Sequence, residues 1–93
     1  MSALVLPLVP TGVRLLFFAS ARQAVGHARL ERTVPSGGLT AERLLDDLVA
    51  EFPRLRRILP SCRLVVNGEY VGSRSHRLGP GDEVAVHPPY SGG

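Results

Sequence analysis

The sequence predicts an α+β fold in which a mixed sheet of about five strands packs on one main helix. Three observations predict it. Residues 40–52 carry apolar side chains at helical spacing. Asn67-Gly68, between two apolar runs, is the strongest short signal for a β-hairpin. Val84 and Val86 alternate with other side chains, as in a strand. The 93 residues allow one modest core and therefore a single domain.

Two strands and a short helix are expected in the first part of the chain. Val13–Ala19 is a largely apolar run, typical of a strand that is buried on both faces. Ser20–Gly26 begins with a suitable N-cap and ends with a suitable C-cap, which predicts a short helix. Ala28–Val34 is expected to be a strand that is partly covered on one side.

The main helix is expected from Thr40 to Phe52, because Thr40 is a suitable N-cap and Pro53 ends the helical pattern. Asp46 and Asp47 on its polar face could be taken for a catalytic carboxylate pair. Adjacent residues of a helix point about 100° apart, so a solvated face explains them better. The apolar stripe is formed by Leu44, Leu45, Leu48, Val49 and Phe52.

The remaining elements are strands and turns. Arg63–Val66 is expected to be a strand that returns through Asn67-Gly68 to a short strand at Tyr70-Val71. Leu78–Asp82 contains the glycines and the proline of a second turn. Glu83–His87 is then the last strand.

The domain organisation follows from these elements. We expect residues 1–12 to form a loosely ordered N-terminal lead, residues 13–87 to form the domain, and residues 88–93 to form an extended functional tail. No segment is long and apolar enough to suggest a membrane span. A single cysteine, Cys62, excludes an internal disulfide and fits a reducing compartment, so we expect the protein in the cytoplasm.

Composition argues against two classes of function. All eleven basic residues are arginines, but the cluster at Arg54, Arg56 and Arg57 has no interleaved aromatic residues, and no nucleic-acid motif is present. A solvated surface explains the cluster better than nucleic-acid binding. His27, His76 and His87 show no metal-ligand spacing, and no nucleophile and base are paired, so an independent enzyme is the least favoured class.

The tail holds the candidate site. Pro88 and Pro89 cannot donate to a sheet ladder, so the chain is expected to leave the domain in an extended conformation. Six extended residues reach at most roughly 20 Å, enough to enter another protein's pocket. Gly92 and Gly93 lack a Cβ and could pass a narrow channel, while Tyr90 would anchor the tail in the partner. The Gly93 carboxylate would need activation, and an adenylate would let sulfur replace AMP to give a thiocarboxylate.

The end of the chain resembles the C-terminal signature of the small subunits of molybdopterin synthase. The resemblance is carried by Leu78-Gly-Pro-Gly-Asp-Glu-Val-Ala-Val86 and Pro88-Pro-Tyr-Ser-Gly-Gly93. Leu16-Phe-Phe-Ala19, the helix at residues 40–52 and Val66-Asn-Gly-Glu-Tyr-Val71 are also similar to that family, so the likeness covers roughly residues 13 to 93. Two departures are the lead at residues 1–12 and Tyr90, where an aliphatic residue is more usual.

The resemblance implies the ubiquitin-like β-grasp fold and a sulfur carrier that is non-catalytic alone. It implies that an E1-like activating enzyme consumes ATP to adenylate Gly93, which then becomes a 1-thioglycine, with no permanently bound cofactor and no metal. The large synthase subunit would hold cyclic pyranopterin monophosphate and the catalytic side chains, in a heterotetramer of two small and two large subunits. The partner-binding tail would be Pro88, Pro89, Tyr90, Ser91 and Gly92.

Three other functions stay open at this point. The chain could carry sulfur for thiamine or for tRNA thiolation, or it could be a ubiquitin-like protein modifier. It could also be a non-catalytic interaction module, with the arginines at residues 54–57 binding a partner and an inert tail.

Overall fold

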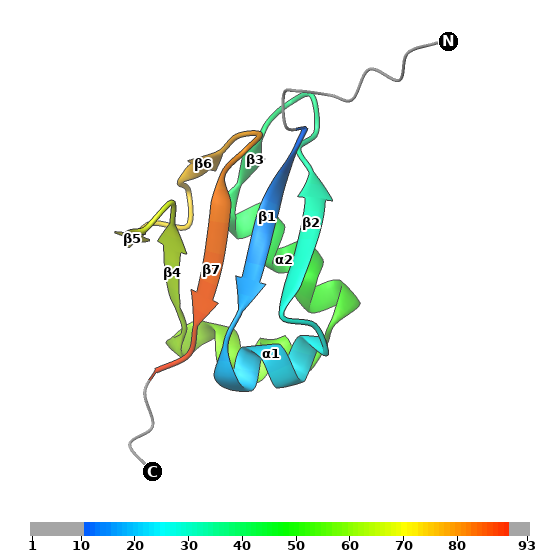
Figure 1. The fold of residues 1–93 in the computed structure, drawn as a ribbon, viewed down its shortest axis with the longest axis vertical. Helices are drawn as coiled ribbons and strands as arrows, with labels where there is room; N and C mark the ends of the chain where they lie inside the picture. Colours follow the sequence, from blue (N-terminus) through cyan, green and yellow to red (C-terminus); the bar gives the residue numbers. More distant parts are fainter. Residues whose placement is uncertain (1–10, 90–93) are drawn as a thin grey trace, which may run out of the picture.

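The computed structural model describes residues 11–89, so the predictions about residues 1–10 and 90–93 lie outside the described part. A five-stranded sheet in the order β2-β1-β7-β4-β5 packs on helix α2 (Figure 1). β1 and β7 are parallel, and the other neighbours are antiparallel. The sheet consists of β1 (Gly12–Phe17), β2 (Arg29–Thr33), β4 (Arg63–Val66), β5 (Glu69–Val71) and β7 (Glu83–His87). The predicted α+β fold with a mixed sheet is confirmed.

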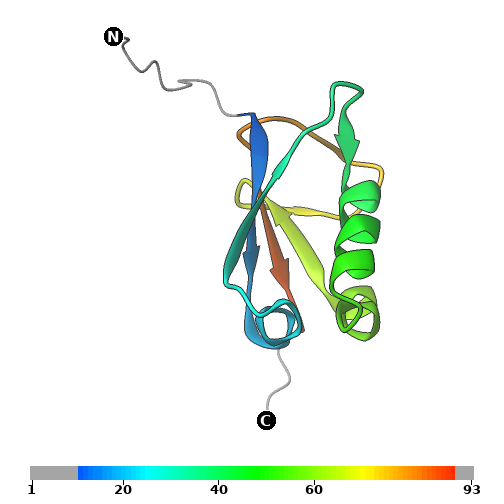
Figure 2. The ribbon, with the colours of Figure 1, turned by 90° about the vertical axis from the view of Figure 1, so that its right-hand side faces the viewer.

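The remaining elements lie beside this sheet. Figure 2 shows α2 on one face of the sheet, while no helix covers the opposite face in the described part. We call the first the covered face and the second the open face. No helix within residues 11–89 is long and apolar enough to cross a membrane. The elements beside the sheet are α1 (Ala19–Val25), β3 (Leu39–Thr40), α2 (Ala41–Glu51), α3 (Leu55–Ile58), the 3-10 helix η1 (Leu59–Ser61) and β6 (Arg77–Leu78). The strands β3 and β6 pair with each other.

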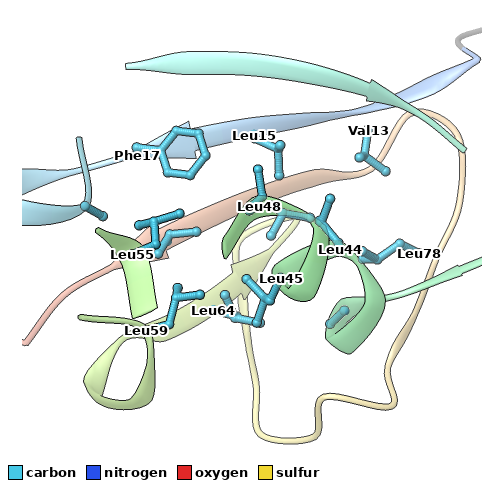
Figure 3. Close-up of a cluster of buried hydrophobic side chains, with 14 of the residues drawn as sticks. Val13, Leu15, Phe17, Leu44, Leu45, Leu48, Leu55, Leu59, Leu64 and Leu78 are labelled. Carbon is cyan, nitrogen blue, oxygen red and sulfur yellow. The ribbon is translucent and has the colours of Figure 1, made fainter. Parts of the chain in front are cut away.

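The core lies between the covered face and the helices (Figure 3). Leu15 of β1 and Leu55 of α3 are both 0% exposed, and Leu48 of α2 is 1% exposed. Figure 3 shows side chains from the sheet, α2 and α3 meeting in this one cluster. Burial of this apolar surface is the main force that holds α2 on the sheet.

The first strand differs from its prediction. Val13, Leu15 and Phe17 are buried, but Arg14 is exposed and Leu16 is only half-buried. The expectation of a strand buried on both faces is wrong, because successive side chains of a strand point to opposite faces and the helices cover only one of them.

The caps of the two longer helices explain where these helices begin and end. Thr40 accepts a hydrogen bond from the Arg43 backbone N–H at 3.2 Å, so its predicted role as N-cap of α2 is confirmed. Gly26 is the C-cap of α1 with a φ of 86°, as expected. Ser20 is not an N-cap, because α1 begins one residue earlier, after Phe18.

The hairpin turn at Asn67-Gly68 is confirmed, with φ of 52° and 87° at the two residues. Such left-handed conformations suit Asn and Gly and match the twist of the two strands. The segment after α2 was expected to be an arginine-rich connection, but it forms α3 and η1. Leu55 and Leu59 of this segment are buried in the core, which supplies the packing that fixes so short a helix.

Candidate functional site

The candidate site begins where β7 ends. β7 lies in the middle of the sheet, between β1 and β4, and its last residue is His87. Pro88 follows half-buried and Pro89 exposed. Because proline has no backbone N–H, the ladder cannot continue past His87, and the chain leaves the sheet there. The predicted site residues Tyr90, Ser91, Gly92 and Gly93 lie outside the described residues.

The aromatic ring of Phe18 is stacked on His87 beside this exit. The ring centroids are 4.4 Å apart and the planes differ by 9°. The backbone of Phe18 is held in place, because its carbonyl accepts hydrogen bonds from the N–H groups of Ala21 and Arg22 at the start of α1. Phe18 is nevertheless 41% exposed. The stack joins the end of β1 to the end of β7 and places the exposed Phe18 ring beside the exit of the chain.

Arg63 and Tyr70 lie on the other side of His87. Arg63 is the Cα partner of His87 across β4 and β7. The Arg63 guanidinium carbon lies 5.4 Å from the centroid of the Tyr70 ring, which is a cation–π arrangement. Both side chains are exposed. Together with His87, Pro88 and Pro89 they line a surface hollow of about 500 Å³.

The opposite end of β7 is built from hydrogen bonds. The Asp82 carboxylate accepts from the Gly79 backbone N–H at 2.8 Å and from the Asn67 side-chain amide at 2.9 Å. The Asn67 side-chain oxygen accepts from the Glu83 backbone N–H at 2.9 Å. The Gly79 hydrogen bond, followed by that from Asn67, lowers the pKa of Asp82 below its ordinary value. This network fixes the start of the strand that leads to the tail.

Cys62 and the histidines are the other described residues that the sequence offered for chemistry. Within residues 11–89 no three side chains of His, Cys, Asp and Glu are placed to hold a metal ion. Cys62 is half-buried, and its thiol lies 3.3 Å from the carbonyl of Ile58. Burial raises the pKa of Cys62, and the positive charge of Arg74 opposes this only in part. A protonated thiol is a poor nucleophile.

Sequence reasoning missed Phe18, Arg63 and Tyr70 as neighbours of the tail. The alternation of side chains could have placed each of them on the open face of its strand. Only the strand order and register bring them together at one end of the sheet, and these depend on long-range pairing.

Comparisons with known proteins agree with this geometry. The ThiS family matches residues 15–93. The molybdopterin synthase sulfur carrier subunit of Arabidopsis thaliana is 38% identical over 84 residues, which cover 87% of this chain and 82% of the relative. That of Chlamydomonas reinhardtii is 37% identical over 83 residues, with 87% and 98% covered.

Solved structures share the fold. A putative molybdopterin converting factor subunit 1 from Pyrococcus furiosus superposes with a TM-score of 0.76 at 26% identity, covering 86% of this chain and 99% of that chain. SAMP1 from Haloferax volcanii does so with a TM-score of 0.76 at 28% identity, covering 88% and 99%. The described fold is therefore the ubiquitin-like β-grasp fold. With a matching family over most of its length and curated relatives above 35% identity, the chain belongs to the ThiS family and, within it, to the molybdopterin synthase sulfur carrier subunits.

Proposed function

We propose that this chain carries sulfur on its C-terminal glycine for molybdopterin synthesis. The Gly93 carboxylate is adenylated and converted to a thiocarboxylate, which donates sulfur to cyclic pyranopterin monophosphate in molybdenum cofactor biosynthesis. The observation that carries the proposal is the identity with curated sulfur carrier subunits over 87% of the chain. The abrupt end of β7 at Pro88 supports it, because a tail that leaves the sheet is free to enter a partner.

The chemistry requires an activated carboxyl group. A carboxylate is a poor electrophile, and transfer of AMP from ATP makes a mixed anhydride with a good leaving group. A sulfur nucleophile then displaces AMP and leaves the thiocarboxylate on Gly93. The activating enzyme consumes ATP to form the Gly93 acyl-adenylate, so the chain binds the nucleotide as this adenylate and holds no permanent cofactor.

The proposal implies two protein partners in the cytoplasm. An E1-like enzyme adenylates and thiocarboxylates the tail. The large subunit of molybdopterin synthase receives it, holds the pterin substrate and supplies the catalytic side chains, in a heterotetramer of two small and two large subunits. In this assembly Pro88, Pro89, Tyr90, Ser91 and Gly92 lie in the partner, with Tyr90 as the anchor.

A second candidate function is protein modification. The likeness to SAMP1 of Haloferax volcanii, a small archaeal modifier protein, favours it. The same adenylate serves both outcomes, because a lysine amine as well as a sulfur nucleophile can displace AMP from it. The chain itself contains no lysine, so it cannot be extended into lysine-linked chains of itself. Conjugates that shift in mass on a denaturing gel distinguish the modifier from the carrier.

Intact mass spectrometry tests the proposal. The protein is purified from a host that contains its activating and sulfur-transfer enzymes, and replacement of one terminal oxygen by sulfur adds about 16 Da. Oxidation of Cys62 or Met1 by one oxygen atom adds about the same mass, so fragment ions must place the shift on Gly93. A Cys62→Ser variant removes the first of these ambiguities without touching the tail.

The expected result is a shift on Gly93 that persists in Cys62→Ser and disappears when Gly92 and Gly93 are deleted. A tail that stays an unmodified carboxylate, with both enzymes shown to be active on another carrier, would contradict the sulfur-carrier function. That outcome would favour the interaction module.

A further inference from the structure

We propose that Arg63 anchors the partner that receives the tail, by binding a carboxylate side chain of that partner. The anchor lies within what we call the exit surface, formed by Phe18, Arg63, Tyr70 and His87. The inference rests on the proposed function, since it concerns the protein into which the tail is inserted.

The exit surface exposes apolar area where a partner must approach. Phe18 is 41% exposed and Tyr70 is 70% exposed, and these are the two large hydrophobic side chains that residues 11–89 leave exposed. Phe18 and His87 are stacked, and Arg63 lies opposite His87 on β4, so these three side chains form one row across the end of the sheet. Tyr70, whose Cα partner on β4 is Val65, lies diagonally beside Arg63. Exposed aromatic residues next to arginine are typical of the centres of protein interfaces. A protein that encloses the tail as far as Pro88 would cover this row.

Arg63 has no anionic partner within the described chain. Ion pairs there are formed by Arg14 with Glu83, Arg32 with Glu51 and Arg43 with Asp47. Arg63 takes part in none of them, nor does it donate a side-chain hydrogen bond to another residue between 11 and 89. Its guanidinium carbon instead lies over the Tyr70 ring, 5.4 Å from the ring centroid. A planar group with five N–H donors and no carboxylate partner among residues 11–89 is suited to a bidentate carboxylate.

The hollow beside Arg63 is the place for that carboxylate. It measures about 500 Å³ and is lined by Arg63, Tyr70, His87 and the two prolines at the base of the tail. Rings and prolines form much of its wall, so a partner that closes over it would exclude water from the ion pair. Exclusion of water strengthens the attraction between opposite charges. An aspartate or glutamate of the partner therefore fits this hollow better than an apolar side chain does.

A titration of the full-length chain with the large synthase subunit tests the anchor. Arg63→Glu should weaken binding about 10- to 100-fold, because a charge-assisted pair is replaced by repulsion. Its affinity should also depend less steeply on salt concentration. Arg77→Glu is the matched control: it makes the same charge change on exposed Arg77 of β6, which Figure 1 shows at the opposite end of the sheet from the end of β7, and should weaken binding less than about threefold. Arg63→Lys should be intermediate, since lysine keeps the charge and loses the planar fork.

Two further outcomes would show that Arg63 binds something other than a carboxylate of the partner. If the penalty of Arg63→Glu vanishes in a semisynthetic chain with a Gly93 carboxamide, the anion is the chain's own terminus. If the free wild-type chain dimerises in sedimentation and Arg63→Glu makes it monomeric, the occupant is a second copy. A carboxylate in the partner is supported if reversing one acidic residue of the large subunit to arginine restores binding of Arg63→Glu and not of Arg77→Glu.

Failure of the inference can be distinguished from failure of the proposed function. If the wild-type chain is thiocarboxylated and binds the large subunit, but Arg63→Glu binds as tightly as Arg77→Glu, the anchor is wrong and the carrier function stands. If the wild-type chain is not thiocarboxylated, or does not bind the large subunit at all, the proposed function itself is wrong.

Discussion

The two faces of the sheet use similar side chains for different purposes. On the covered face, Leu15 and Phe17 are at most 2% exposed and pack against the helices. On the open face, their neighbours Leu16 and Phe18 are half-buried and exposed. Residue type alone does not separate these roles, since adjacent phenylalanines fall on opposite sides. The position of α2 decides which apolar residues stabilise the domain and which remain available for a partner.

The pair Phe17 and Phe18 tests this comparison with the largest expected effect. Phe17→Ala should lower the free energy of unfolding by about 3–5 kcal/mol, because it leaves a cavity in the core. Phe18→Ala should lower it by about 1 kcal/mol, through loss of the ring stack. Urea denaturation of both variants measures the difference. If Phe17→Ala does not fold, the milder pair Phe17→Leu and Phe18→Leu, which removes less volume, replaces it. Phe17→Leu should then be less stable than Phe18→Leu. Equal losses in both pairs would contradict the division between the faces.

The open face is itself divided into a polar end and an aromatic end. Arg14 and Glu83 form an ion pair near the start of β7, next to the network of Asn67 and Asp82. The exit surface lies at the other end of the same strand. Side chains at the polar end make their contacts within the domain, whereas the aromatic end leaves Arg63 without a carboxylate in the described residues. This difference assigns fold stability to one end and binding to the other.

Substitutions at Asn67 test this division between the two ends of the sheet. Asn67→Ala should lower the free energy of unfolding by about 1–3 kcal/mol, because it loses two hydrogen bonds and places alanine at a positive φ. Asn67→Gly keeps the conformation without strain and should lose only the part that comes from the hydrogen bonds. Binding to the large subunit should not change in either variant while the protein is folded. Weaker binding by folded Asn67→Gly would show that the polar end also contributes to the interface.

The sequence could predict the elements with local signals. Thr40 and the leucines of α2, Asn67-Gly68, Gly26 and the last strand all depend on nearby residues, and each lies where expected. It could not predict α3, because a four-residue helix depends on the packing of Leu55 into the core.

The sequence could predict only the part of the candidate site that is continuous in the chain, which is the tail. The glycines and prolines of the tail indicate chemistry at Gly93, which stays a prediction since residues 90–93 lie outside the described part. The exit surface depends on β1, β7, β4 and β5 being neighbours, and residues 18 and 70 are far apart in sequence. No local pattern specifies such pairing.

At acid pH the protein should lose a small part of its free energy of unfolding, because Asp82 at the polar end becomes protonated. Hydrogen bonds from Gly79 and Asn67 lower the pKa of Asp82 in the folded protein below its ordinary value of 3.8. The group therefore adds stability above about pH 4, and this stability is lost as the pH falls through the lower pKa of the folded state. Asp82→Asn keeps an oxygen that can accept from the Gly79 N–H but has no charge to titrate.

Urea denaturation of both proteins at several pH values measures this contribution. The difference in free energy of unfolding between wild type and Asp82→Asn should be constant between about pH 7 and pH 5, and should shift against the wild type below about pH 4. The shift should be small, because Asp82 is only half-buried and water screens its charge. A difference that stays constant down to about pH 2.5 would mean that the charge of Asp82 adds nothing to the stability of the folded protein. The polar end would then be stabilised by its hydrogen bonds whatever the charge of Asp82.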